Sequence, residues 1–190
     1  VLFCMDRAGI AGEDGPTHHG ALDIAYMRSI QNMIVTAPKN GNELRRLMYT
    51  ALSVKDQPFS IRYPKASSVE FQELDQIELL PIGSWDVEQK GEDVLVLAVG
   101  PMTYTSLEAT KKTILKNYKI EVVNCRFIKP MDVDYLLKIK NKFSKVITVE
   151  EGNVVGGFGD GVASWLLENG FKGNFKKIGL PDNFVEHGSR

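Results

Sequence analysis

The chain has 190 residues, of which 43% are hydrophobic and 25% are charged, and its formal net charge at pH 7 is -1. This composition is typical of a globular protein with one large domain or two small ones, and it excludes a general electrostatic attraction to nucleic acid or to an anionic membrane surface. The longest apolar run, residues 94–99, is far shorter than the roughly 20 residues of a membrane span. We therefore expect no nucleic-acid partner and no membrane segment.

The first half of the chain alternates strands with helices. Apolar runs bounded by turn residues predict strands at residues 1–9, 32–38 and 58–64. Helical spacing predicts helices at 19–30 and 40–54, the second capped by Asn40 or Asn42. The expected inward faces are Leu22, Ala25, Tyr26 and Ile30 in the first helix, and Leu44, Leu47, Met48 and Leu52 in the second.

The second half repeats the alternation after a break. Residues 66–80 are polar and lack a clear period, which is typical of a linker. Beyond them, apolar runs predict strands at 93–100, 119–125, 145–151 and 174–180, and helical spacing predicts helices at 106–118, 131–143 and 160–170. Because strands joined through helices form parallel sheets, the predicted fold class is α/β, with two parallel-sheet units at residues 1–78 and 79–190.

The two cysteines, Cys4 and Cys125, lie far apart, each within or beside an apolar run that predicts a strand. We expect both to be buried free thiols of a cytoplasmic protein in a reducing compartment, because no disulfide framework or secretory signal is recognisable. The chain begins without methionine, directly in an apolar run, so we expect a piece of a longer polypeptide.

Ligands of open parallel sheets gather beyond the carboxyl ends of the strands. In the first unit these ends carry Arg7, the polar loop 13–20 "EDGPTHHG", and Arg62. A guanidinium presents a planar fork of donors that matches phosphate or carboxylate. We therefore expect Arg7, Asp14, His18 and Arg62 to converge on one open cleft for an anionic ligand. The alternative is that each arginine pairs with a neighbouring acid.

The loop histidines suit acid–base chemistry better than metal binding. Adjacent side chains in extended backbone point opposite ways, and His187 is the only other histidine, so the sequence disfavours a zinc site. Because imidazole titrates near neutrality, His18 or His19 could serve as a general acid or base, and the other would be structural. Asp14 could orient that histidine, bind hydroxyl groups or simply form the turn before Gly15.

The glycine-rich stretch 150–161, "EEGNVVGGFGDG", follows a predicted strand and precedes a helix. Its G-x-G-x-G spacing differs from the G-x-G-x-x-G of dinucleotide sites, and no acidic residue ends the next strand. We interpret it as close packing at the start of a helix. The sequence leaves open whether Glu150 and Glu151 form a polar interface contact or an exposed turn.

These motifs carry a resemblance to a known family. The segments "DRAG" (6–9), "DGPTHHGALDIAYMRSIQNMIVTAP" (14–38), "IRYPK" (61–65), "RFIKPMD" (126–132), "TVEEGNVVGGFG" (148–159) and "GLPDNFVEHGSR" (179–190) are similar to the 1-deoxy-D-xylulose-5-phosphate synthase family of the transketolase superfamily. "DGPTH" is shared with transketolases generally, whereas the following "HG", the "RYP" and the final segment point to the synthases. The resemblance implies that residues 1–78 are the later part of a pyrimidine-binding domain and 79–190 a transketolase C-terminal domain.

The resemblance also implies a reaction. The family condenses pyruvate with glyceraldehyde 3-phosphate, releasing carbon dioxide, for isoprenoid, thiamine and pyridoxal biosynthesis. It uses thiamine diphosphate and Mg²⁺, and a homodimer is expected. By motif match, Arg7 and Arg62 would bind the triose phosphate, Asp14 would bind hydroxyl or carbonyl oxygens, and His18 would donate to the developing alkoxide or shuttle a proton. No role follows for His19 or His187.

The resemblance places part of the cofactor site outside the chain. The glutamate that activates the aminopyrimidine, and the domain that binds diphosphate and magnesium, are expected upstream of Val1. Asp160 in "FGDG" lacks the surroundings of a metal site, so the chain alone is expected to be inactive. Two alternatives remain: another thiamine enzyme (transketolase or the β subunit of a 2-oxo acid dehydrogenase), and a non-catalytic dimerisation module.

Overall fold

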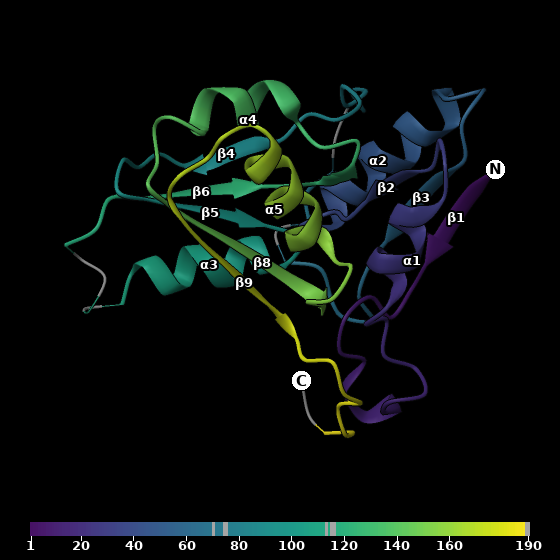
Figure 1. Cartoon of the computed structure of the whole chain (residues 1–190). Helices are drawn as coiled ribbons and strands as arrows, with labels where there is room; N and C mark the ends of the chain where they lie inside the picture. Colours follow the sequence, from purple (N-terminus) through teal and green to yellow (C-terminus); the bar gives the residue numbers. More distant parts are fainter. Residues whose placement is uncertain (70, 74–75, 113, 115–116, 189–190) are drawn as a thin grey trace.

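Two sheets lie side by side in the computed structural model, which describes residues 1–69, 71–73, 76–112, 114 and 117–188 (Figure 1). The first sheet has the order β1-β3-β2-β7, in which β1, β3 and β2 are parallel and β7 is antiparallel to β2. Its strands are β1 (Leu2–Met5), β2 (Ile34–Thr36), β3 (Phe59–Arg62) and β7 (Phe127–Lys129), and the helices that accompany it are α1 (Asp23–Ser29) and α2 (Gly41–Ser53).

The second sheet has the order β4-β6-β5-β8-β9 and is parallel except for β4. In Figure 1, α3 covers one face of this sheet, and α4 and α5 lie over the other. The elements are β4 (Asp86–Gln89), β5 (Val94–Ala98), α3 (Met102–Thr110), β6 (Ile120–Asn124), α4 (Val133–Ile139), β8 (Lys145–Asn153), α5 (Phe158–Glu168) and β9 (Asn174–Leu180). None of the helices in the described residues is long and apolar enough to cross a membrane.

The predicted fold class, two α/β units with parallel sheets, is confirmed, and the two antiparallel strands were missed. β4 is a half-exposed edge strand with little apolar signal. β7 has only three residues and belongs to the second half of the chain, yet it pairs with β2 of the first half. α3 begins before the expected residue 106, and part of the expected helix 106–118 and of the expected linker 66–80 lies outside the described residues.

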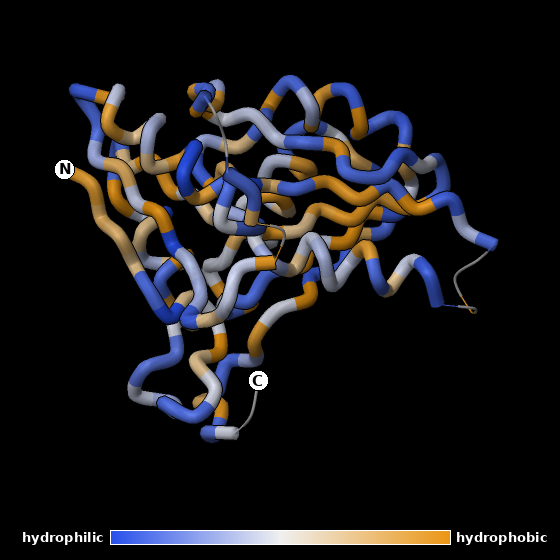
Figure 2. Tube along the Cα trace, turned by 180° about the vertical axis from the view of Figure 1, so that it is seen from behind, coloured by the Kyte–Doolittle hydropathy of each residue, from blue (hydrophilic) through white to orange (hydrophobic). Residues whose placement is uncertain are grey.

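One hydrophobic core spans both halves of the chain. Ile34 and Ile61 of the first sheet belong to the same buried cluster as Leu97 of β5 and Phe158 of α5. In Figure 2 the inner strands are mostly hydrophobic along the trace, and the turns around them are mostly hydrophilic. Burying a side chain of this size stabilises a fold by about 1.5–3 kcal/mol, so the shared core couples the two units.

The expected inward faces of α1 and α2 are partly wrong. In α1 the buried residues are Asp23, Ile24 and Met27, whereas Leu22, Tyr26 and Ile30 are exposed. Asp23 turns inward because its carboxylate binds the buried guanidinium of Arg62. In α2, Leu47 is buried as expected, and Met48 and Leu52 are exposed.

The amino-terminal cap of α2 is confirmed. Asn40 Oδ1 accepts a hydrogen bond from the backbone N–H of Glu43 at 2.9 Å, and Glu43 Oε2 accepts one from the backbone N–H of Lys39 at 2.7 Å. These reciprocal bonds satisfy backbone donors that the helix itself leaves unpaired. The alternative cap, Asn42, lies inside the helix.

The expectation that both thiols are buried is wrong for Cys4. Both cysteines are free, but β1 is an edge strand and exposes Cys4. Cys125 follows a central strand and is fully buried, and this burial raises the pKa of its thiol.

The glycine-rich stretch packs closely, as predicted, and an internal carboxylate occupies the start of its helix. Glu150 Oε2 and Oε1 accept hydrogen bonds from the backbone N–H groups of Phe158 and Gly159, both at 2.8 Å. A Cβ on Gly159 would lie 2.6 Å from Thr148 Oγ1. The amino terminus of α5 is therefore already neutralised from within, and Glu150 is an interior contact rather than part of an exposed turn.

Replacement of Glu150 tests this internal cap. In Glu150→Gln, one of the two backbone N–H groups would face an amide NH₂ instead of an acceptor, so we expect the free energy of unfolding to fall by about 1–3 kcal/mol. Urea denaturation measures the change. Glu168→Gln, at the exposed end of the same helix, should change it by less than about 0.5 kcal/mol. Equal stability of the two variants would contradict the cap.

Candidate active site

The loop 13–20 is held in shape at its base. Gly20 N donates to Arg7 O at 2.9 Å, and Gly9 N donates to Gly20 O at 3.0 Å. Arg7 itself has a φ of 58°, a left-handed conformation that costs a non-glycine residue strain and is common at functional sites. A Cβ on Gly9 would lie 2.3 Å from Glu151 Cδ, so the turn needs glycine there. These contacts therefore fix the backbone conformation at the base of the loop.

Arg7 and Asp14 are brought together, and a residue that sequence reasoning missed joins them. Arg7 Nε donates to Asp14 Oδ2 at 2.8 Å, and Lys65 Nζ lies 2.8 Å from both carboxylate oxygens of Asp14. The Lys65 ammonium and the Arg7 guanidinium lower the pKa of Asp14 to about 2, so this carboxylate is ionised at neutral pH. Lys65 directly follows the "RYP" segment, which was the available signal.

The two loop histidines differ in their surroundings. His18 is exposed, and its Nδ1 lies 3.0 Å from Thr17 Oγ1, which leaves Nε2 available to a ligand. His19 Nδ1 accepts a hydrogen bond from the backbone N–H of Ala11 at 2.9 Å. This bond crosses the loop and gives His19 a structural role, in line with the expectation that one histidine of the pair is structural.

Arg62 does not open onto a common cleft with the loop, and that expected convergence is wrong. Its side chain is 4% exposed, and its Nε donates to Asp23 Oδ2 at 2.7 Å. Its Nη2 donates to the backbone oxygens of Gly20 at 3.1 Å and Glu151 at 3.0 Å. In this structure Arg62 supports the loop from behind, and its expected role in substrate binding stays a prediction.

A pocket of about 520 Å³ lies beside the Arg7–Asp14–Lys65 cluster at the carboxyl ends of β1, β2 and β3. Asp6, Tyr63 and Lys65 line it. Asp6 also accepts a hydrogen bond from Arg7 Nη1 at 2.5 Å, so the pocket adjoins two cations and two carboxylates. Such a rim can bind a ligand that carries both phosphate and hydroxyl groups.

The second unit supports this site. Ile10 N donates to Glu151 Oε1 at 3.0 Å, and Asn153 N donates to Ala21 O at 2.7 Å. The carboxyl-terminal segment also reaches the loop, since Gly188 N donates to Gly12 O at 3.3 Å, and Figure 1 shows the yellow segment beside the purple loop at the bottom of the view. Glu151 is therefore an interface contact, which resolves the alternative that the sequence left open.

Two observations concern where a metal ion or a diphosphate could bind among the described residues. No group of three or more His, Cys, Asp or Glu side chains suited to a metal is found among them. The amino terminus of α5, where a diphosphate could bind, is taken by Glu150.

Two family models match consecutive parts of the chain. "Transketolase, pyrimidine binding domain" matches residues 1–69, and "Transketolase, C-terminal domain" matches residues 83–190. The chain belongs to the transketolase family. The boundary between residues 78 and 79 stays a prediction.

Individual relatives of this transketolase-family chain are synthases. It is 43% identical to 1-deoxy-D-xylulose-5-phosphate synthase of Aquifex aeolicus over 192 residues, and 43% identical to that of Halothermothrix orenii over 189 residues. These alignments cover 100% and 99% of this chain but 30% of each relative, so the chain spans about a third of their length. A solved structure of a split-gene transketolase, described as an inactive β4 tetramer, superposes with a TM-score of 0.83 at 29% identity, covering 96% of this chain and 58% of the other.

Replacement of Arg62 tests its supporting role. Arg62→Met would leave the Asp23 carboxylate buried and unpaired, so we expect a loss of about 3–5 kcal/mol in the free energy of unfolding. The control is Arg46→Met, which breaks the more exposed ion pair with Glu78 and should cost about 0–1 kcal/mol. Chemical denaturation compares the two, and a small loss for Arg62→Met would mean that its pair with Asp23 is dispensable.

Proposed function

We propose that this chain is the carboxyl-terminal part of a 1-deoxy-D-xylulose-5-phosphate synthase. The observation that carries the proposal is 43% identity across the whole chain to proteins of that name. The reaction is the condensation of pyruvate with glyceraldehyde 3-phosphate, with loss of carbon dioxide, in isoprenoid precursor biosynthesis and in supply of thiamine and pyridoxal. The protein is a transferase of the transketolase type.

The chain's own residues act on the triose phosphate in this proposal. Arg7 retains Nη2 for a phosphate oxygen, since its Nε and Nη1 bind Asp14 and Asp6. Asp14, ionised and accepting only, binds substrate hydroxyl groups, and Lys65 adds a second cation. His18, with its Nε2 available, donates a proton to the oxygen that becomes an alkoxide.

Thiamine diphosphate and Mg²⁺ belong to the proposal as cofactors of the complete enzyme. When bound, thiamine diphosphate would supply the electron sink for decarboxylation, and Mg²⁺ would hold its diphosphate. In the proposal their ligands come from the rest of the protein, since this chain spans 30% of the length of its synthase relatives.

The proposed protein is also a homodimer and is located in the cytoplasm. The exposed apolar side chains of Leu22, Tyr26 and Ile30 on and beside α1 are suited to burial against a second copy, which supports a homodimer. The two free thiols support a cytoplasmic location.

Two other functions keep specific support. The solved split-gene transketolase favours a transketolase, and its inactive tetramer favours a non-catalytic assembly module. Release of carbon dioxide from pyruvate that depends on glyceraldehyde 3-phosphate distinguishes the synthase from both.

Substitution of His18 in the full-length protein tests its role. If His18 acts as acid or base, His18→Ala should lower kcat by a factor on the order of 10² or more. Glu13→Gln, an exposed neighbour in the same loop, serves as the control and should leave kcat within about twofold. Arg7→Ala should instead raise the KM for the triose phosphate. If kcat and KM are unchanged in both His18→Ala and Arg7→Ala, the non-catalytic assembly module is favoured over the synthase.

The 190-residue chain alone should form no deoxyxylulose phosphate. With thiamine diphosphate, Mg²⁺ and both substrates present, we expect product below the detection limit, because the proposal places the cofactor ligands in the rest of the protein. Chromatography of the reaction mixture measures this, with the full-length protein as positive control. Turnover by the isolated chain would contradict the proposed division of the cofactor site.

A further inference from the structure

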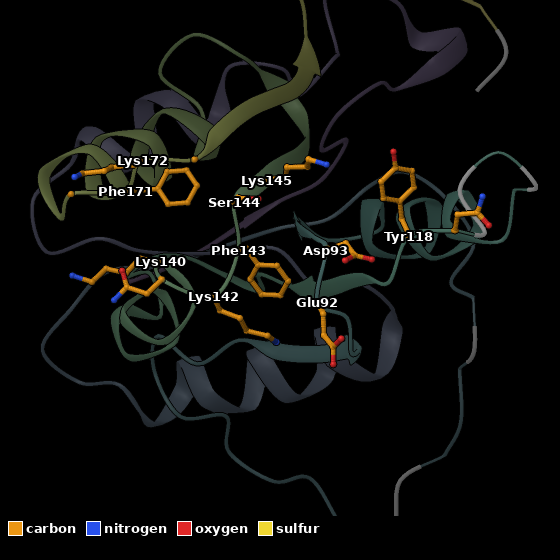
Figure 3. A pocket seen from close by; sticks show the side chains of 14 residues that line it. Glu92, Asp93, Tyr118, Lys140, Lys142, Phe143, Ser144, Lys145, Phe171 and Lys172 are labelled. Atoms are coloured by element: carbon orange, nitrogen blue, oxygen red, sulfur yellow. The ribbon is translucent and has the colours of Figure 1, made fainter.

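A hollow of about 780 Å³ lies at the amino-terminal ends of β5, β6 and β8, but its lysines do not converge (Figure 3). In Figure 3 the side chains of Lys140 and Lys172 point away from Lys145. Lys140 Nζ also donates to the backbone oxygen of Asn169 at 3.3 Å. These lysines therefore form no common site for an anion, whereas the loop of the first unit holds a side chain, His19, that has no assigned role in the reaction.

The ring of His19 has a single polar contact among the described residues. Its Nδ1 accepts a hydrogen bond from the backbone N–H of Ala11 at 2.9 Å, so Nδ1 carries no proton and the neutral ring carries its proton on Nε2. Nε2 is buried and has no hydrogen-bond partner within the described part of the chain. Leaving a buried donor unpaired costs free energy, so the ring is held in this position by the bond of Nδ1 to Ala11 and not by Nε2.

Ala11, the partner of His19, is held in place from two sides. Its neighbour Ile10 donates its backbone N–H to Glu151 Oε1 at 3.0 Å, which joins this part of the loop to the second unit. Ala11 O accepts a hydrogen bond from the backbone N–H of Asp14 at 3.4 Å, so Ala11 also bonds the turn that carries Asp14. Supporting contacts of this kind preorganise the side chains of a site.

His19 also ends the turn that presents His18. The backbone N–H groups of His18 and His19 both donate to Gly15 O, at 3.0 Å and 3.2 Å. The ring of His19 is bound to Ala11, while the neighbouring side chain of His18 is exposed. The bond between His19 and Ala11 therefore ties the turn that carries His18 to the segment that carries Asp14.

We propose that His19 is a positioning residue for the reaction of the Arg7 loop. Through its bond to Ala11 it holds His18 and Asp14 in the mutual arrangement that the substrate requires, and it touches neither substrate nor cofactor. This role rests on the proposed function, in which His18 acts as acid or base. A displacement of about 1 Å can lower a rate about 10²-fold, so loss of the bond across the loop has a measurable effect on kcat.

Two substitutions of similar size test the bond in the full-length protein. In His19→Asn, Oδ1 takes the place of Nδ1 and can accept from Ala11, whereas in His19→Leu no acceptor remains. We expect His19→Leu to lower kcat on the order of tenfold, and His19→Asn to keep kcat within about threefold of the wild-type value. Steady-state kinetics with pyruvate and glyceraldehyde 3-phosphate measures both.

Circular dichroism and thermal melting verify that each variant is folded at the temperature of the assay. If His19→Leu does not fold, His19→Phe takes its place, because phenylalanine keeps a ring at this position but has no acceptor for the N–H of Ala11. Equal kcat values of His19→Asn and the variant without an acceptor would overturn the positioning role.

A double-mutant cycle separates positioning from a general effect on stability. In the His18→Ala background, His19→Leu should change kcat by less than about threefold, because the side chain that His19 positions is gone. A purely stabilising role would give the same fold-loss of kcat in both backgrounds, and that result would also overturn the inference.

The positioning role and the proposed function can fail separately. If His18→Ala lowers kcat as expected but the two His19 variants have equal kcat, only the positioning role is wrong. If His18→Ala leaves kcat unchanged, the acid–base role of His18 in the proposed function is wrong, and the positioning role fails with it.

Discussion

The guanidinium of Arg62 is the contact on which the arrangement of the first site depends. It joins Asp23 of α1, the backbone of Gly20 at the base of the loop, and the backbone of Glu151 in β8. Gly20 and Asp23 belong to the first unit and Glu151 to β8 of the second sheet, while Arg62 itself ends β3 of the first sheet. A buried guanidinium without its carboxylate is costly, so the loop, α1 and the end of β8 must assemble together. The conformation of the loop that carries Asp14 and His18 thus depends on the second unit.

The interface between the units is correspondingly polar at the end of β8. Glu150 caps α5, Glu151 accepts from Ile10, and Arg28 of α1 donates to the backbone oxygens of Gly156 at 2.6 Å and Gly157 at 2.5 Å. Glycines are needed here because charged side chains and backbone meet without space for a Cβ. Hydrogen bonds have directional requirements that apolar packing lacks, so this interface fixes an orientation that the shared core alone would not.

Local patterns predicted the types of most elements, and long-range pairing explains the misses. The run at β5 and the cap of α2 are readable because their causes lie within a few residues. The inward face of α1 is not, because Asp23 is buried only through Arg62, 39 positions later, a hydrogen bond that periodicity does not encode. Lys65 was missed for the same reason, since its partner Asp14 lies 51 positions away. Local patterns marked Arg7, Asp14 and His18 as candidate site residues, which stays a prediction, but not which of their side chains are paired.

The cations of the Arg7–Asp14–Lys65 cluster are already balanced by carboxylates. At the loop, Arg7 and Lys65 bind Asp6 and Asp14, so an incoming phosphate gains attraction only by sharing donors with carboxylates already in place. Such a site favours a ligand that also offers hydroxyl groups to Asp14, and it discriminates against inorganic phosphate. Internal pairing at the loop therefore supplies selectivity at the expense of affinity.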